Sequence, residues 1–464
     1  MEFLNQMNEE SFTKPDFQKT WIALKHLRKR EWWSRMWVMQ EALFAKQLKF
    51  HCGKKSADRI SFTRLHEIAA KYRGVETRDK SLDAMSMTIA TPFDVILMDW
   101  DKYKEDLAHE GVRLRKLLVV TTDSLCADPR DKIFALLSMC RKVDRKVLKI
   151  DYRASVRWLL TILCKYELIE REIYSPLSLL QTVRRKKNPM LPSWVSDYTS
   201  NGDDDKLCVP ATEGKVPYQA AANNTAWAAL GLASLQPVMV SHFNGMEASF
   251  EDEGFFETLV LTGLVVDTIQ ASFQAAEVEI YEGTDPKEDG ERKTLRRQNV
   301  VQACREWEEQ VQNLPPERDL YTSTCGRDEA FWRTLIADRD LFWNGPPSEA
   351  QDFAGRFQAW MGRHHDEKMN TDEDFIRPFN QAAVWRCMRR SFIITKKGYI
   401  GLGSRVPRPS DVVCILREGD VPFVLRPRVD EYYELVGEAY IHDIMDGSFV
   451  RTATRRQLRQ FKIR

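Results

Sequence analysis

Residues 391–403 read SFIITKKGYIGLG, two short apolar, β-branched runs separated by a Lys-Gly pair. Such runs on either side of a Gly-containing turn are typical of a β-hairpin. The pattern continues in DVVCILREGDVPFVLRP (411–427) and YYELVGEAYI (432–441), each again bounded by turn-forming Gly and Asp residues. We therefore predict a small β-barrel or twisted β-meander over residues 391–464.

The sequence upstream of this module reads mainly as helices. Residues 31–47 place large apolar side chains at helical spacing, and residues 111–140 predict two helices broken at Asp128-Pro129. By contrast, TLVLTGLVVDTIQAS (258–272) alternates and is rich in β-branched residues, which indicates strand. The fold class predicted is α+β, with mostly helical N-terminal and middle regions and a C-terminal β module.

Changes in composition suggest where these regions meet. A stretch rich in Pro, Ser, Asn and Gly begins at residue 188, so we divide the chain into 1–187, 188–390 and 391–464. Within the middle region, EGTDPKEDGERKT (282–294) reads as a flexible, exposed loop. The basic C-terminal tail, 451–464, reads as a solvated helix.

Composition limits the class of protein. Among 464 residues, 69 basic side chains face 68 acidic ones, so no global field favours nucleic acid. Nine cysteines without a Cys-x-x-Cys pair indicate a reduced protein without a zinc framework. The longest apolar stretch, 227–240, is too short to span a membrane. We expect a soluble protein, cytoplasmic or nuclear, that needs no metal or cofactor.

Several motifs occur in a fixed order along the chain. The block WWSRMWVMQEALFAKQLKFHCG (32–53) is followed by DPRDKIFALLSM (128–139), IDYRASV (150–156) and LPSWVSDY (191–198), and then by the β module. Together these blocks resemble the fungal heterokaryon-incompatibility (HET) family. In the first block, the residues that carry the resemblance are Arg35, Trp37, Gln40, Glu41, Cys52 and Gly53; in the second they are Asp128, Arg130, Asp131, Lys132, Ala135 and Leu136.

The resemblance implies a role in fungal non-self recognition and cell death. Family members open with a Ser-Tyr-x-Trp-Gly block and a strand reading Trp-Ile-Asp-x-x-Cys-Ile-Asn-Gln, and neither occurs here. The chain is therefore expected to lack the N-terminal part of the HET domain. That domain is thought to resemble Toll/interleukin-receptor-type α/β folds, some of which cleave NAD. Without the leading strands, NAD cleavage is not expected.

The tryptophan-rich helix supplies the candidate catalytic group. Trp37, Gln40 and Glu41 fall within one helical turn, and a carboxylate beside Trp33 and Trp37 would be desolvated, as suits a general acid. The candidate catalytic residues are Glu41, Gln40 and Arg35. The favoured alternative is structural: both tryptophans are core anchors, and Glu41 pairs with an arginine, either Arg35 or Arg130.

Aromatic residues make up 11% of the chain and could line an apolar pocket between helical and β portions. The candidate substrate-binding residues are Trp33, Trp37, Arg130, Tyr399 and Tyr440. Ordinary core packing explains the aromatic residues equally well, and capping of a helix explains the charges around Arg130. The adjacent pair His364-His365 is rejected as a metal site, because neighbours on a helix point about 100° apart.

Two functions follow from these patterns. The first is a HET-like protein of fungal incompatibility, whose partner is another protein. The alternative is a repurposed, cofactor-independent cyclase of secondary metabolism, with pericyclic (Diels–Alder type) chemistry on an apolar terpenoid or polyketide. Such a reaction needs only a rigid apolar pocket and one or two polarising groups.

Overall fold

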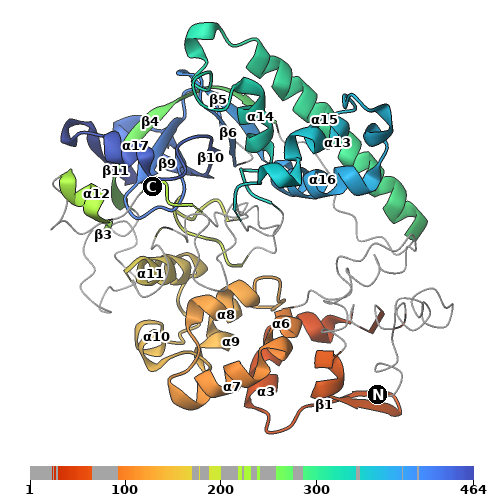
Figure 1. Cartoon of the computed structure of the whole chain (residues 1–464). Helices are drawn as coiled ribbons and strands as arrows, with labels where there is room; N and C mark the ends of the chain where they lie inside the picture. The colour runs from red at the N-terminus through yellow and green to blue at the C-terminus, as the bar shows by residue number, and fades with distance from the viewer. Residues whose placement is uncertain are drawn as a thin grey trace. The chain divides into compact units, whose positions relative to one another are not determined.

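The structure of the chain is a computed structural model (Figure 1). It describes residues 23, 26–27, 30–64, 92–169, 177, 188–199, 218–221, 224–230, 238–240, 258–274, 286–340, 345–388, 390–404 and 407–464. Two compact units emerge, with Met1–Leu159, Tyr198–Gly202 and Glu282–Arg292 in unit 1 and the remaining residues in unit 2.

Unit 1 is built from short helices and one hairpin. Its elements are η2 (Glu31–Ser34), α3 (Val38–Phe44), β1 (Lys49–Cys52), β2 (Lys55–Asp58), α6 (Pro92–Met98), α7 (Trp100–His109), α8 (Leu114–Val120), α9 (Asp131–Leu137), α10 (Lys142–Val147) and the start of α11 (Val156–Ile169). The break at Asp128-Pro129 between α8 and α9 confirms the prediction from the sequence. β1 and β2 pair antiparallel around Gly53, whose φ of 60° suits a glycine.

The single helix predicted over 31–47 is interrupted, so that prediction was wrong. η2 ends at Ser34, Arg35 is extended with ψ of 130°, and α3 begins only at Val38. The reason is a parallel bridge between Arg35 and Leu125. Met36 N donates to Leu125 O at 2.8 Å, and Leu125 N donates to Ser34 O at 2.5 Å. These bonds engage backbone groups that a continuous helix would use itself.

Unit 2 contains the β module and the helices beside it. Its helices are α12 (Asn224–Ala229), α13 (Pro286–Gln312), α14 (Arg327–Leu335), α15 (Phe353–Trp360), α16 (Glu373–Cys387) and α17 (Ser448–Thr452). Its strands are β3 (Val238–Val240), β4 (Leu259–Phe273), β5 (Ser391–Thr395), β6 (Ile400–Gly403), β7 (Val412–Leu416), β8 (Phe423–Pro427), β9 (Tyr432–Glu438), β10 (Tyr440–Ile441) and β11 (Leu458–Ile463).

The strands form a closed barrel with an extension. β4 pairs with β11, β11 with β9, β9 with β8, β8 with β7, and β7 again with β4, so these five strands close a ring. The second half of β4 pairs instead with β5, which leads on to β6 and β10. The predicted α+β class and the C-terminal barrel are therefore confirmed.

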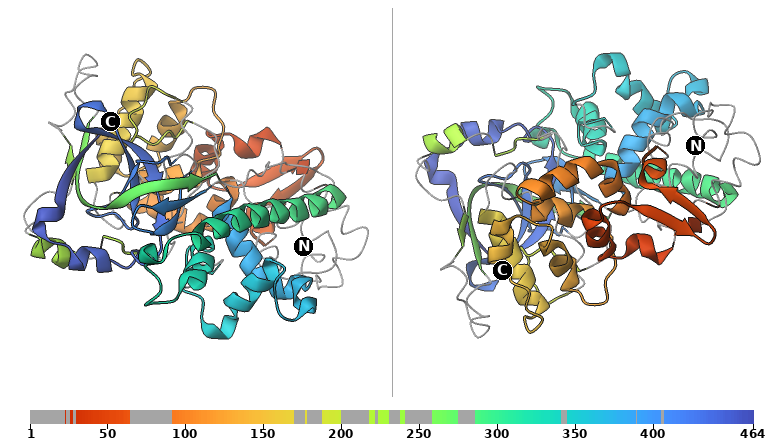
Figure 2. Two further views of the ribbon diagram at one scale, coloured as in Figure 1. Left: turned by 90° about the horizontal axis from the view of Figure 1, so that it is seen from above. Right: turned by 90° about the horizontal axis from the view of Figure 1, so that it is seen from below.

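Strand β4 makes this topology possible because it is long and irregular. Figure 2 shows it in green as a long curved strand, and its register shifts between Val265 and Asp267 and between Ile269 and Ala271. Such bulges bend a strand and increase its twist. At Gly263 a Cβ atom would lie 2.5 Å from the carbonyl oxygen of Ile415, so only glycine permits this approach of β7.

The barrel interior is apolar and continuous. It holds the inward side chains of the strands together with the indole of Trp227, which is buried. On the helical side, the rings of Trp307 in α13 and Phe392 in β5 stack with centroids 5.3 Å apart. Phe331 of α14 packs edge-on against the same Phe392 at 5.7 Å. Aromatic contacts therefore join the helices of unit 2 to its sheet.

The basic tail was predicted as a helix, and most of it is not. Only its first residues lie in α17, and residues Leu458–Ile463 form β11, which pairs antiparallel with β4 and parallel with β9. Phe461 and Ile463 are fully buried in this strand while Lys462 is exposed. Over residues 460–463 polar and apolar residues alternate, which is typical of a strand. The many basic residues of the tail obscure this alternation in the sequence.

The loop predicted over 282–294 is also corrected. Helix α13 begins at Pro286 and continues to Gln312, so residues 286–294 are helical, while 282–285 lie outside the described residues. Proline is favoured at the first helical position, and the Lys, Glu and Arg that follow are good helix formers. High charge suggests a disordered loop, but these charged residues are compatible with a helix.

Candidate functional site

In unit 1, the motif residues form a polar cluster centred on the carboxylate of Asp131. Trp37 Nε1 donates to Asp131 Oδ2 at 3.1 Å, and the Tyr152 hydroxyl donates to Asp131 Oδ1 at 2.6 Å. This hydrogen bond to Asp131 is the main reason that the pKa of Tyr152 is raised to about 12. One carboxylate thus joins three of the sequence blocks.

Arg130, a candidate substrate-binding residue, is engaged in the same cluster. Its guanidinium forms a bidentate pair with Asp128, with Nε–Oδ1 at 2.9 Å and Nη2–Oδ2 at 2.7 Å. It also donates to the carbonyl oxygens of Tyr152 and Ala154. Lys132 is buried and donates to the carbonyl oxygen of Thr122 at 2.9 Å. These contacts give the block a structural role.

The three candidate catalytic residues do not form a buried site. Glu41 and Arg35 are both exposed, so the expectation that Glu41 is desolvated between two indoles was wrong. Gln40 is half-buried and donates to the Ser138 hydroxyl. Glu41 lies on α3 on the side turned to solvent, because Val38, Met39, Ala42 and Leu43 fill the core side of this short helix.

Trp33 is a core residue of unit 1. Its indole is buried and stacks on Phe50 with centroids 5.3 Å apart, and it also contacts Phe62 and Phe93. Its Nε1 donates to Leu27 O at 2.8 Å. The interpretation of this tryptophan as a core anchor is the one that its surroundings favour.

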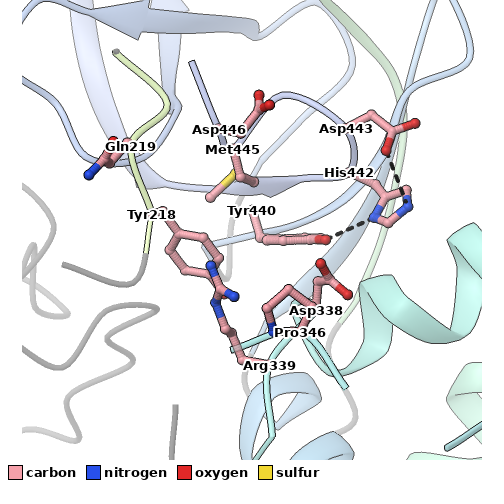
Figure 3. A pocket seen from close by; sticks show the side chains of 10 residues that line it. All are labelled: Tyr218, Gln219, Asp338, Arg339, Pro346, Tyr440, His442, Asp443, Met445 and Asp446. Carbon is pink, nitrogen blue, oxygen red and sulfur yellow. Dashed lines mark hydrogen bonds and ion pairs between the residues drawn. The ribbon is translucent and has the colours of Figure 1, made fainter. Parts of the chain in front are cut away.

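Unit 2 holds a pocket of about 460 Å³, shown in Figure 3. It receives side chains from the segment at residue 218, from the chain after α14, and from β10 and the loop that follows it. The lining residues are Tyr218, Gln219, Asp338, Arg339, Pro346, Tyr440, His442, Asp443, Met445 and Asp446. Tyr440 was a candidate from sequence. Tyr399 does not line this pocket and lies at the β5–β6 turn, where its N–H donates to Thr395 Oγ1 at 3.0 Å.

The floor of the pocket is the pair Tyr440 and His442, which are both buried. The Tyr440 hydroxyl lies 2.8 Å from His442 Nδ1, and His442 Nε2 lies 3.6 Å from Asp443 Oδ1 (Figure 3). His442 Nε2 is also 3.7 Å from the thiol of Cys325. Burial lowers the pKa of His442 to about 4, and burial raises the pKa of Asp443 and of Cys325.

One wall of the pocket has a constrained backbone. Ala337 and Asp338 have φ of 49° and 52°, values that residues with side chains seldom adopt. The Tyr218 hydroxyl donates to Ala337 O at 2.5 Å, and Asp338 pairs with Arg333 at 2.6 Å. The guanidinium of Arg339 lies 5.1 Å from the centre of the Tyr218 ring. Hydrogen bonds and an ion pair therefore hold the polar groups of this wall in place.

Sequence reasoning missed His442 and Cys325. They are separated by 117 positions and belong to no spacing pattern, so only the fold brings them together. Within the described ranges, no group of three or more His, Cys, Asp and Glu side chains is arranged to hold a metal ion. Among the helices of the described residues, none is both long and apolar enough to cross a membrane.

Replacing Asp131 with Asn should destabilise the protein, whereas Glu41→Gln should not. The asparagine amide offers one acceptor oxygen where two donors converge, so the part-buried bond to Trp37 or the exposed bond to Tyr152 is lost, at a cost of about 1 kcal/mol. The exposed Glu41 variant should change the free energy of unfolding by no more than about 0.5 kcal/mol. Urea unfolding of both variants measures this. Equal losses would refute the structural role of Asp131.

The lowered pKa of His442 predicts a pH dependence of stability. The unfolded state takes up a proton near the ordinary value of 6.5, and the folded state does so only near 4. Stability from the neutral imidazole is therefore present above about pH 6.5 and is lost as pH falls towards 4. We expect the stability difference between the natural protein and His442→Gln to shrink over that interval in unfolding experiments. A difference independent of pH would contradict the assignment.

Comparison with known proteins adds independent information. The family model of the Het-6 beta-barrel domain matches residues 358–461, which include α16 and β5 to β10. The chain is 24% identical to "Heterokaryon incompatibility protein 6, OR allele" of Neurospora crassa over 506 aligned positions, covering 96% of this chain and 67% of that protein. No solved structure matches the chain. The match and the similarity confirm the resemblance to heterokaryon-incompatibility proteins that the motifs predict.

Proposed function

We propose that this fungal protein acts in heterokaryon incompatibility, the process in which fused cells of different genotype are rejected. The observation that carries the proposal is the similarity to a heterokaryon incompatibility protein over 96% of the chain, not over the barrel alone. Both units lie within that span. We therefore infer that the role in the relative's name requires both the helical unit and the barrel.

Hydrogen bonds made by the sequence blocks within each unit support a role that requires both units to be folded. In unit 1, Asp131 joins three sequence blocks. In unit 2, the Ser193 hydroxyl of the LPSWVSDY block accepts from Leu435 N at 2.8 Å and donates to the carbonyl of Arg464. This block therefore secures β9 and the end of β11. Residues shared with the family thus maintain each fold, and allelic differences are expected on exposed surfaces, where they do not disturb these contacts.

The cyclase alternative stays a prediction, as does the expected lack of NAD cleavage. A cyclase for an apolar substrate requires an aromatic-lined pocket. The pocket described above places the carboxylates of Asp338, Asp443 and Asp446 and the guanidinium of Arg339 beside its two tyrosines. This charged lining favours the incompatibility proposal over the cyclase.

The proposal is tested by fusing strains that are isogenic except for this gene. Each strain carries one of two natural variants of the gene, and a vital dye measures the death of fused cells. We expect death in fusions of unlike variants and survival in fusions of like variants. Equal survival in both kinds of fusion would overturn the proposal.

Two substitutions at neighbouring positions of β11 test whether the rejection of fused cells requires the folded barrel. Phe461 is fully buried, and the neighbouring Gln460 is exposed. Phe461→Asp places a charge in the barrel interior and should abolish the rejection response, whereas Gln460→Asp should preserve it. Immunoblots confirm that both variants are expressed.

A further inference from the structure

Cys325 and His442 are brought together from two different elements of unit 2. Cys325 directly precedes Gly326, the N-cap of α14, and His442 directly follows β10. The thiol sulfur lies 3.7 Å from His442 Nε2. A thiol within reach of an imidazole nitrogen is the arrangement of a nucleophile with its general base, and such contacts are often loose when no substrate is bound.

The imidazole is held in a defined orientation. Its Nδ1 faces the Tyr440 hydroxyl at 2.8 Å, and the Tyr321 ring lies with its centroid 5.4 Å away. His442 is 4% exposed, so its ring is enclosed. For Nε2 to accept the thiol proton, the neutral imidazole carries its own proton on Nδ1, and this N–H donates to the Tyr440 hydroxyl oxygen. Nε2 then faces Cys325 and Asp443. Tyr440 is therefore a positioning residue for the base, the third member of a nucleophile–base–orienter set.

Cys325 is more accessible than the buried thiols of unit 2. Cys325 is partly exposed, whereas Cys304, Cys387 and Cys414 have no exposed surface. His442 contacts the thiol and also lines the pocket of about 460 Å³. The base therefore lies between the partly exposed thiol and the pocket, which Cys325 itself does not line.

We propose that Cys325 is a nucleophile for acyl transfer from an activated ester or thioester, with His442 as its general base. The sulfur forms a bond to the carbonyl carbon, and the bond from that carbon to the leaving oxygen or sulfur breaks. The thiol proton passes to His442 Nε2 and from there to the leaving group. Helix α14 begins two residues after Cys325, and its N-terminal dipole favours the negative charge that develops.

The charges around the pair are mixed. The titratable groups that act on the imidazole or the thiol are Asp338, Asp443, Glu329 and Arg333. Burial outweighs them, so the thiol and the imidazole are both neutral at neutral pH. This is the state from which a base removes the proton during attack, as it does from a serine hydroxyl. The proposal does not depend on the role in incompatibility.

The test follows acylation of the full-length chain by 4-nitrophenyl acetate, with each cysteine monitored by mass spectrometry. At neutral pH, Cys325 should react at least about tenfold faster in the natural protein than in His442→Gln, because the base is lost. As the pH rises the two rates should approach each other, because a growing fraction of the thiol ionises without a base, although burial raises its pKa. Exposed Cys52 is the internal control and should react equally in both proteins.

Unfolding of the variant would be detected in the same experiment. Cys414 is fully buried and becomes acylated only if the barrel opens. If His442→Gln exposes Cys414, Tyr440→Phe replaces it, because this change removes only the hydroxyl that holds Nδ1, and the same pH-dependent loss is expected. The proposal is overturned if Cys325 reacts at the same rate with and without the base at neutral pH, or stays unmodified while Cys52 is acylated.

Discussion

The closure of the barrel by β4 is the constraint on which unit 2 depends. This strand has 15 residues, and its first half receives β11 along one edge and β7 along the other. Without β4, the ring from β11 through β9 and β8 to β7 would be open, leaving unpaired backbone groups at two edges. Gly263 permits the close approach of β7, and the bulges beyond it redirect the strand towards β5.

That closure also determines where the pocket forms. Because β5, β6 and β10 extend from the second half of β4, His442 at the end of β10 meets Cys325 at the start of α14. The residues 440–446 lie within the match to the Het-6 beta-barrel domain, whereas Tyr218, Cys325 and Asp338 lie outside it. The pocket therefore combines the matched domain with segments that precede it in the chain, and a fragment limited to 358–461 would lack β4 and one wall of the pocket.

The sequence was most informative where structure is local. The hairpins after residue 391 and the helix break at Asp128-Pro129 follow from alternation and turn residues, and both were predicted. Charge misled us at Leu458–Ile463 and at 286–294, where basic or mixed side chains concealed a strand and a helix. For the candidate site, Tyr440 was named from sequence, but its partner His442 and the thiol of Cys325 depend on a long-range contact that no spacing reveals. Glu41 had the right neighbours in sequence, yet the short helix α3 turns it to solvent.

Amide hydrogen exchange of the full-length chain, read by mass spectrometry, tests the closure of the barrel most directly. The amides of residues 259–273 bond to β11, β7 and β5, so they should be protected to the same degree as those of β7 and β8. Rapid exchange in residues 259–273 while β7 and β8 stay protected would contradict a barrel closed by β4.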